Sequence, residues 1–374
     1  MALQFVMKLS KLCNLRCTYC YEFEDLHKKE RMPLSGIEFF LKGLAEHYRE
    51  RPDAPEIRFI CHGGEPLLLP AEYLREFRRL QDLYLKPAGL RYTTSLQTNL
   101  TRLSDKTVDL LRELNISLGV SFDVFGEQRV NRKGNPMDER VLDNLQRLLD
   151  AGVPFGAIVV MHAANRDRVL ETYRFYNALG INYRILPIFS HIEPPARVAP
   201  LMLTHEQALE SLKAVAYEHL TQPTQIKVMP ISDHLAAAVR HLAGQKVSDY
   251  RPTESYEWAL IVGTDGAVYN HGDSYLAEGR IGNLFQTEFG KLMNGADHRA
   301  MDAHRMARAS TCQKCTYAGA CDQLPVIESI PSERRYDANG QLTCPLARPL
   351  IDYCIELIRS NERAGEIIDL ARAA

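Results

Sequence analysis

This 374-residue sequence lacks the features that mark a nucleic-acid or membrane partner. Its 45 lysines and arginines are balanced by 47 aspartates and glutamates, so the formal net charge is only −2 and no strongly basic surface is expected. No stretch approaches the ~18 consecutive apolar residues of a membrane span, and the N-terminus lacks the basic and then apolar pattern of a signal peptide. We therefore expect a globular protein of the reducing cytoplasm, long enough for two or three domains.

Cysteine is the informative residue type, because its nine copies are unevenly spread. Three lie between residues 13 and 20, and four more are Cys312, Cys315, Cys321 and Cys344. In a cytosolic chain such clustering favours metal ligation over disulfides. Cys61 and Cys354 stand apart and are interpreted as small buried hydrophobic side chains.

The first cluster is Cys13, Cys17 and Cys20, which have the spacing C-x3-C-x2-C and directly follow the apolar segment Leu3–Leu9. Four thiolates would close a metal site, whereas three thiolates around an iron–sulfur cube leave one iron open to a substrate or cofactor. The spacing therefore predicts a reactive iron. A zinc knuckle or a group of buried thiols is the alternative interpretation.

From this loop to about residue 200, short β-type runs alternate with helix-type runs. The expected strands are Leu3–Leu9, Glu56–Cys61, Tyr92–Thr98, Ser117–Phe122, Phe155–Met161 and Tyr183–Ile188. We expect helix caps at Ser104 and at Ser35, the latter in a capping box with Glu38. This alternation predicts an α/β fold with parallel strands, a partial (β/α)6 barrel whose chemistry lies at the carboxyl ends of the strands.

Polar residues follow three of these strands. The second strand runs into His62-Gly63-Gly64-Glu65-Pro66, where paired glycines let the backbone approach a ligand closely and a glutamate can accept from an ammonium. The third strand ends in Gln97-Thr98-Asn99, and the fourth in Ser121-Phe122-Asp123 with Arg129 further on. Because carboxyl ends of parallel strands share one edge, these groups are expected near the cysteine loop.

Together these motifs resemble the signature of the radical S-adenosylmethionine (SAM) enzymes. The resemblance implies that the three cysteines hold a [4Fe-4S] cluster, with Tyr19 beside the last of them, and that SAM binds the open iron. The SAM contacts that it implies are Gly63, Gly64, Glu65, Gln97, Asn99, Ser121, Asp123 and Arg129. Arg132 is an alternative to Arg129, because Ser121 and Arg129 are closer in sequence than in the sulfatase-maturing relatives. Leu186 is expected either as an apolar wall for the adenine or as an ordinary core residue.

The second half of the chain begins with two amphipathic helical runs, about 204–220 and 231–242, interpreted as scaffold or as part of a substrate wall. A β-hairpin is then expected from Ala259–Gly263 and Ala267–Asn270, since Asp265-Gly266 supplies the positive φ of a tight turn. A long final helix is expected over about 349–373.

The four late cysteines have the spacing C-x2-C-x5-C followed by Cys344, which suits a zinc site as well as an iron–sulfur cluster. With the hairpin and Gly282-Asn283-Leu284, this run resembles the SPASM domain, which carries auxiliary [4Fe-4S] clusters. Two cysteines of the full pattern are replaced, by Pro325 and within Asn270-His271. The resemblance therefore implies one fully ligated auxiliary cluster, suited to electron transfer or structural support.

These assignments divide the chain into four expected parts. They are a radical SAM partial barrel over 1–200, a helical connector over 201–254, a reduced SPASM or twitch domain over 255–345 and a C-terminal helix over 346–374.

The resemblance also implies the chemistry. A flavodoxin- or ferredoxin-type partner reduces the cluster, SAM is cleaved, and the 5′-deoxyadenosyl radical abstracts hydrogen from an unactivated carbon. The stretch Val120–Gly126, with Arg129 and Lys133-Gly134, is similar to glycine-rich-repeat peptide maturases. The expected function is therefore oxidative crosslinking of a precursor peptide, as a C–C cyclophane or a thioether. Since the cysteine loop begins at residue 13, no extra N-terminal peptide-binding module is expected, and a leader peptide would bind the barrel, the C-terminal domain or a separate protein.

Three alternatives stay open at this point. An anaerobic sulfatase maturase would oxidise a cysteine or serine to formylglycine, and a twitch-type dehydrogenase would oxidise a small molecule. A non-catalytic metal-binding scaffold would need the three-cysteine site to be structural. Asp273, just after the hairpin, is the candidate catalytic acid or base, with a solvated loop aspartate as the alternative.

Overall fold

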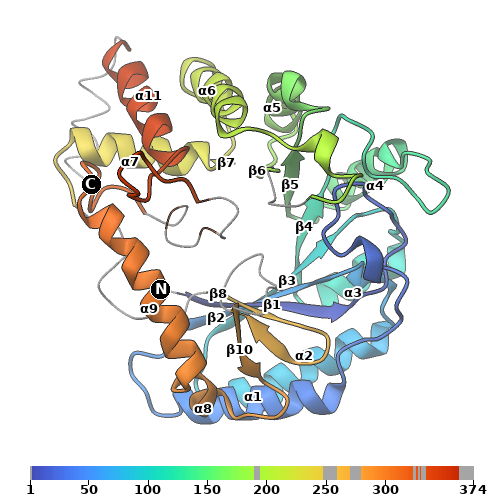
Figure 1. Ribbon diagram of the computed structural model, residues 1–374. Helices are drawn as coiled ribbons and strands as arrows, with labels where there is room; N and C mark the ends of the chain where they lie inside the picture. The colour runs from blue at the N-terminus through green and yellow to red at the C-terminus, as the bar shows by residue number, and fades with distance from the viewer. Residues whose placement is uncertain are drawn as a thin grey trace. The chain divides into compact units, whose positions relative to one another are not determined.

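The computed structural model describes residues 2–188, 194–246, 259–269, 279–322, 326, 329 and 334–361 (Figure 1). Its backbone divides into two compact units. Unit 1 comprises Met1–Phe122, Glu127–Phe155 and Tyr256–Ala303, and unit 2 comprises Asp123–Gly126, Gly156–Ser255 and His304–Ala374. In the described part of the chain, no helix is long and apolar enough to cross a membrane.

Unit 1 is built on a sheet in the order β10-β9-β8-β1-β2-β3-β4. Its strands are β1 (Ala2–Ser10), β2 (Glu56–Gly63), β3 (Tyr92–Thr98), β4 (Ser117–Ser121), β8 (Ala259–Val262), β9 (Ala267–Tyr269) and β10 (Arg280–Asn283). Its helices are α1 (Leu34–Tyr48), α2 (Ala71–Leu85), α3 (Asp105–Glu113), α4 (Asp138–Asp150) and α8 (Phe289–Met293). Strands β1 to β4 run parallel, and β8 adds a further parallel strand on the free side of β1.

The core of unit 1 follows from the alternation along β1. Leu3, Phe5 and Met7 are fully buried on one face, and the Phe5 ring lies 4.8 Å from Phe40 of α1 and 5.8 Å from Phe59 of β2. Since successive side chains of a strand point to opposite faces, the residues between them face the other way. That second face carries Lys8 next to the cysteine loop.

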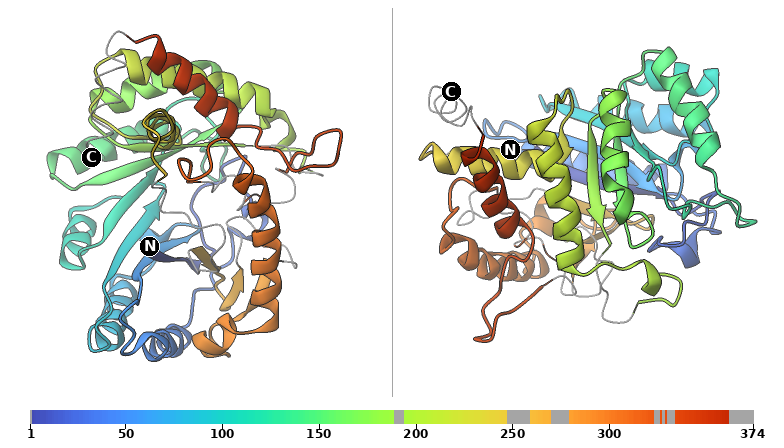
Figure 2. Two further views of the ribbon diagram at one scale, coloured as in Figure 1. Left: turned by 90° about the vertical axis from the view of Figure 1, so that its left-hand side faces the viewer. Right: turned by 90° about the horizontal axis from the view of Figure 1, so that it is seen from above.

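Unit 2 contains the later barrel strands and the C-terminal helices. Its elements are β5 (Phe155–Met161), α5 (Val169–Ala178), β6 (Tyr183–Pro187), α6 (His205–Thr221), β7 (Val228–Met229), α7 (Ile231–Leu242) and α11 (Ala347–Arg359), with α9 (Ala296–Gln313) running into it from the end of unit 1. The strands pair in parallel in the order β5-β6-β7. Helix α11, red in Figure 2, packs against α6 and α7.

The α/β class, the six parallel strands and the hairpin are confirmed. Ser104 accepts from the backbone N–H of Thr107 (3.2 Å) as the expected cap of α3. The capping box at Ser35 is wrong, because α1 begins at Leu34 with Pro33 as its N-cap and Ser35 lies inside the first turn. The last helix begins two residues earlier than expected, at Ala347, and its predicted continuation past residue 361 lies outside the described residues.

Candidate functional site

The three N-terminal cysteines lie in one loop directly after β1. Cys13 donates its backbone N–H to the carbonyl of Leu26 (3.0 Å), and Cys20 donates to the carbonyl of Cys17 (3.0 Å). Their side chains gather around Leu15, Leu26 and Met137. Burial raises the pKa of Cys13 to about 12 and that of Cys20 to about 11. These thiols keep their protons at neutral pH unless a metal replaces them.

A second segment, residues 128–131, fixes the course of this loop. Arg16 donates its backbone N–H to the carbonyl of Val130 (2.7 Å), and Thr18 donates to the carbonyl of Gln128 (3.0 Å). Leu15 forms an antiparallel bridge with Asn131 next to the first of these contacts. The loop is therefore held by main-chain hydrogen bonds in the manner of a short strand.

The glycine pair after β2 packs against the cysteine loop. Gly64 donates its N–H to the carbonyl of Ser10 (2.7 Å), and Glu65 donates to the carbonyl of Leu12 (2.9 Å). A Cβ atom added to Gly63 would lie 2.2 Å from the oxygen of Ser10, and one added to Gly64 would lie 2.2 Å from the oxygen of Leu12. Only glycine permits this approach. The expected contact of both glycines with SAM stays a prediction.

Glu65 connects the end of β2 to the end of β3. Its side chain is 1% exposed and accepts hydrogen bonds from the Asn99 N–H (2.7 Å), the Thr98 hydroxyl (2.8 Å) and the Leu67 N–H (3.0 Å). Burial raises the pKa of this carboxyl, against the opposing effect of these donors. In the structure the Glu65 carboxylate connects the ends of β2 and β3. Its contact with the SAM ammonium stays a prediction.

Asn99 brings a polar side chain to the first cysteine. Its amide nitrogen lies 3.7 Å from Cys13 Sγ and donates to Asn14 Oδ1 (3.1 Å), and Asn14 in turn donates to Thr101 Oγ1 (2.7 Å). A donor near a ligating sulfur stabilises negative charge on it. The predicted site residue Asn99 thus lies beside Cys13.

Gln97 and Ser121 meet on the inner face of β3 and β4. Gln97 donates its side-chain N–H to Ser121 Oγ (2.7 Å). A Cβ added to Gly119 would lie 2.2 Å from Gln97 Oε1, so this glycine provides the space that the Gln97 side chain occupies. The two predicted SAM contacts are therefore neighbours.

Both candidate arginines reach the cysteine loop. Arg129 is 5% exposed and donates to the hydroxyl of Tyr19 (2.7 Å), while the exposed Arg132 donates to the carbonyl of Cys13 (3.4 Å). The burial of Arg129 and its contact with Tyr19 make it part of the loop's framework. The choice between the two for SAM stays open.

Three predicted site residues remain. Asp123, in unit 2, is 2% exposed and accepts from the backbone N–H of Val160 (2.9 Å). Leu186 on β6 is 42% exposed and faces away from the buried Ile185, so it is not an ordinary core residue, and its contact with adenine stays a prediction. Asp273 lies outside the described residues.

The four late cysteines line one cavity of about 430 Å³ in unit 2. Burial raises the pKa of Cys312 to about 12, and the other three thiols add to this shift, which places all four near one another. Cys344 Sγ accepts the backbone N–H of Arg348 (3.3 Å) in the first turn of α11. Arg240 of α7 donates to the carbonyl of Ala320 (2.8 Å) and fixes the loop beside Cys321.

The cavity bears on the choice between zinc and an iron–sulfur cluster. Zinc lies about 2.3 Å from each of its thiolates, and even a water molecule takes only about 30 Å³ of liquid. The cavity of about 430 Å³ is lined by these four thiols among other residues, so it has room for more than one ion. Its donor set suits an iron–sulfur cluster as well as zinc, and the auxiliary cluster stays a prediction.

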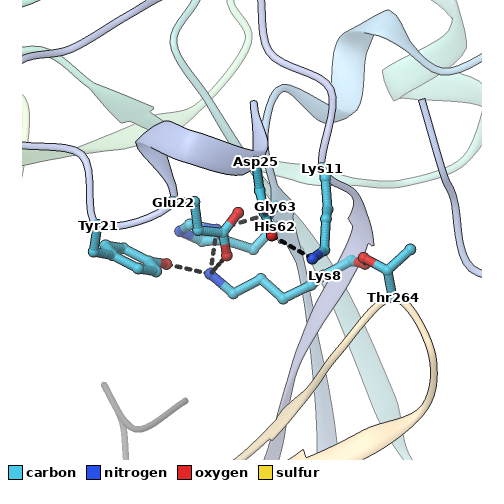
Figure 3. Close-up of polar contacts among 8 residues, drawn as sticks. All are labelled: Lys8, Lys11, Tyr21, Glu22, Asp25, His62, Gly63 and Thr264. Atoms are coloured by element: carbon cyan, nitrogen blue, oxygen red, sulfur yellow. Dashed lines mark hydrogen bonds and ion pairs between the residues drawn. The ribbon is translucent and has the colours of Figure 1, made fainter. Parts of the chain in front are cut away.

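One charged group at the site was missed from the sequence. Lys8, on the inner face of β1, is 3% exposed and contacts Tyr21, Glu22 and His62 (Figure 3). The available signal was a lysine inside the mainly apolar segment Leu3–Leu9, at the strand end nearest the cysteines.

Comparison with known proteins agrees with this geometry. Residues 7–176 match the family model of the Radical SAM superfamily. The chain is 24% identical over 339 residues to the serine-type anaerobic sulfatase-maturating enzyme of Bacteroides thetaiotaomicron, across 85% of this chain and 80% of the relative. Among solved structures, anSMEcpe with bound AdoMet and Cp18Cys peptide has a TM-score of 0.70 at 17% identity, over 100% of this chain and 99% of that one. Streptococcus suis SuiB bound to precursor peptide SuiA has a TM-score of 0.56 at 14% identity, over 91% of this chain and 76% of that one.

The N-terminal part of the chain is thus a radical SAM domain with the partial-barrel fold, and the protein is an enzyme. It is homologous to the anaerobic sulfatase-maturating enzymes. Its cofactors are SAM and a [4Fe-4S] cluster, for which Cys13, Cys17 and Cys20 are the predicted ligands. A purely structural metal scaffold is ruled out.

Replacing Gly64 with alanine should displace the cysteine loop, because the new methyl group would overlap the carbonyl of Leu12. We expect anaerobically reconstituted Gly64→Ala to lose most of the iron of the N-terminal site, measured by iron analysis and by the absorbance of the cluster. Gly156→Ala is the matched control, since its nearest contact would be an ordinary 3.5 Å. Full iron content in Gly64→Ala would contradict this account.

Metal content separates the two thiol sets. At four irons per cube, wild-type protein should bind about eight irons, and the Cys13/Cys17/Cys20→Ala variant about four. Iron, sulfide and zinc would be measured after anaerobic reconstitution. The control is Cys61→Ala/Cys354→Ala, two fully buried cysteines outside both sets, which should keep about eight irons. About four irons falling to none, with zinc retained, would show that the late cysteines hold zinc.

Proposed function

We propose that the protein is a peptide maturase that removes a hydrogen atom from a residue of a precursor peptide and completes a two-electron oxidation there. The observation that carries the proposal is the pair of thiol sets in one chain, three at the end of β1 and four around the cavity in unit 2. The homologous enzymes mature sulfatases, and two structures of similar fold hold peptides.

The residues of the chain have separate tasks in this proposal. Bound SAM and its cluster supply a radical that removes a hydrogen atom from an unactivated carbon. Cys13, Cys17 and Cys20 hold that cluster, while Asn99 stabilises charge at Cys13 Sγ. The four late cysteines would hold one auxiliary cluster. In total the peptide would lose one hydrogen atom from an unactivated carbon to the radical, and then one electron and one proton as the new bond forms. The electron would pass to the auxiliary cluster, and Asp273 stays the candidate for accepting the proton.

For the product, we propose an oxidative crosslink within the peptide, a C–C cyclophane or a thioether. The similarity of Val120–Gly126, with Lys133-Gly134, to the glycine-rich-repeat peptide maturases supports this choice. Formylglycine formation is the second candidate, and the similarity to a sulfatase-maturating enzyme over 85% of the chain favours it. Both products lack two hydrogens when serine is the precursor of formylglycine, but only formylglycine carries an aldehyde.

The reductant in this proposal is of the flavodoxin or ferredoxin type. The compartment is inferred to be a reducing cytoplasm, since cysteines clustered in this way favour metal ligation over disulfides.

Two synthetic peptides test the proposal, one with glycine-rich repeats and one carrying the maturation site of a sulfatase. Each would be incubated anaerobically with the reconstituted enzyme, SAM and dithionite, and analysed by mass spectrometry with and without a hydrazide that traps aldehydes. We expect loss of two hydrogens from the glycine-rich peptide with no hydrazide adduct. An adduct on the sulfatase peptide would support the second candidate, and 5′-deoxyadenosine with neither peptide changed would contradict both.

Variants should separate SAM cleavage from product formation. Cys17→Ala should abolish 5′-deoxyadenosine formation. Cys315→Ala should keep most of it and lower the product several-fold, because a fully ligated cluster transfers electrons and does not bind SAM. Cys354→Ala, in the core of α11, is the control and should change neither quantity. Undiminished product in Cys315→Ala would remove the auxiliary cluster from the reaction.

A further inference from the structure

The carboxyl end of β1 carries a polar cluster around the buried Lys8 that the assigned cofactor contacts do not use. We call Lys8, Tyr21, Glu22 and His62 the Lys8 cluster (Figure 3). The ammonium of Lys8 lies 3.2 Å from Glu22 Oε1 and 3.3 Å from His62 Nδ1, and it donates to the hydroxyl of Tyr21. Burial opposes the charge of Lys8, but Tyr21 and Glu22 outweigh it and raise its pKa. Lys8 is therefore a charged group with three acceptors around it.

The backbone holds this cluster in a fixed register. Lys8 and His62 are directly opposite each other in the parallel pairing of β1 and β2. On the other side, the hydroxyl of Thr264, in the turn between β8 and β9, donates to the carbonyl of Lys8 (2.9 Å). The positions of Lys8 and His62 thus follow from strand pairing and do not depend on a mobile loop.

These contacts determine which nitrogen of His62 carries the proton. Nδ1 lies 2.7 Å from the backbone N–H of Gly63 and 3.3 Å from the Lys8 ammonium. Both groups only donate, so Nδ1 must present its lone pair to them, and the proton of a neutral ring must be on Nε2. Burial, together with the charge of Lys8, lowers the pKa of His62 well below its ordinary value. The ring is therefore neutral, with an Nε2–H donor.

The position of the Lys8 cluster in the sheet indicates which ligand the Nε2–H group of His62 can contact. The predicted SAM contacts run from the end of β2 to β4, through Gln97 and Ser121. The Lys8 cluster lies on the opposite side, between β2 and β8. His62 is half-buried, and among the described residues no hydrogen bond occupies its Nε2. The Nε2–H group of His62 is thus adjacent to the predicted SAM contacts but is not one of them.

We propose that His62 Nε2–H donates a hydrogen bond to a backbone carbonyl oxygen of the peptide substrate, and that Lys8 is the positioning residue that fixes the imidazole in this tautomer. The proposal rests on the proposed function. A neutral donor of fixed direction suits an amide carbonyl, which is neutral and accepts along defined directions.

The test compares three variants with the wild-type holoenzyme on whichever peptide the wild type modifies. His62→Leu removes the donor and should raise the peptide KM about 3- to 10-fold, the effect of one lost hydrogen bond, while the SAM Kd stays unchanged. His62→Gln keeps an acceptor for Gly63 and a donor for the carbonyl, so it should restore most of the affinity. Lys8→Met should raise the peptide KM although the imidazole of His62 is still present. Lys28→Met, which lacks only an exposed ion pair with Asp25, is the control.

A second readout keeps the proposal testable if a variant fails to fold. In wild-type enzyme with histidine labelled by 15N and its clusters oxidised, the signal absent from His62→Gln should show protonated Nε2, and Lys8→Met should weaken that preference. Protonated Nδ1 in the wild type would overturn the proposal, as would an unchanged peptide KM or a raised SAM Kd in His62→Leu. Absence of any peptide modification by the wild type would instead refute the proposed function.

Discussion

The cysteine loop, the predicted site of the radical SAM cluster, depends on a contact between two pieces of backbone. Gly63 and Gly64 lie so close to the carbonyls of Ser10 and Leu12 that no side chain fits between them. The first thiol, Cys13, follows at once. The turn after β2 therefore packs directly against the cysteine loop, and main-chain hydrogen bonds set the geometry of that loop.

Both thiol sets face the same energetic difficulty. Burial raises the pKa of Cys13 and of Cys312 to about 12, so the thiolate form is disfavoured until a metal compensates it. The chain offers polar neighbours in each case. The amide of Asn99 lies near Cys13, and an N–H in the first turn of α11 meets Cys344, where the helix dipole also favours negative charge. Cluster binding and correct local folding are therefore coupled at both ends of the chain.

Much of the fold was predictable because its signals are local. The β-branched and aromatic runs gave β3 and β5 at their observed bounds, and Asp265-Gly266 gave the hairpin. The cap at Ser35 failed for an equally local reason, since Pro33 already supplies the N-cap conformation. The spacing of the thiols and the polar residues at the strand ends predicted the cysteine loop and the residues that lie near it.

The side-chain contacts of the site could not be predicted without knowing how the strands pair. That Lys8 faces His62 follows from the register of β1 and β2, which no local pattern specifies. The structural role of Glu65 is of the same kind, because its partners Thr98 and Asn99 lie more than thirty residues away. A sequence motif can identify the residues of a site, but the residues that they contact depend on which strands pair and in which register.

The parallel pairing of β8 with β1 has a consequence for synthesis of the protein. Among the described residues, one edge of β1 is paired with Ala259–Val262, so that edge stays open until translation has passed residue 262. Unpaired strand edges promote wrong association, and contacts between distant residues form slowly. Strand β1, which leads into the cysteine loop, is thus made long before its sheet neighbour β8, so completion of the sheet around that loop depends on a segment far later in the sequence.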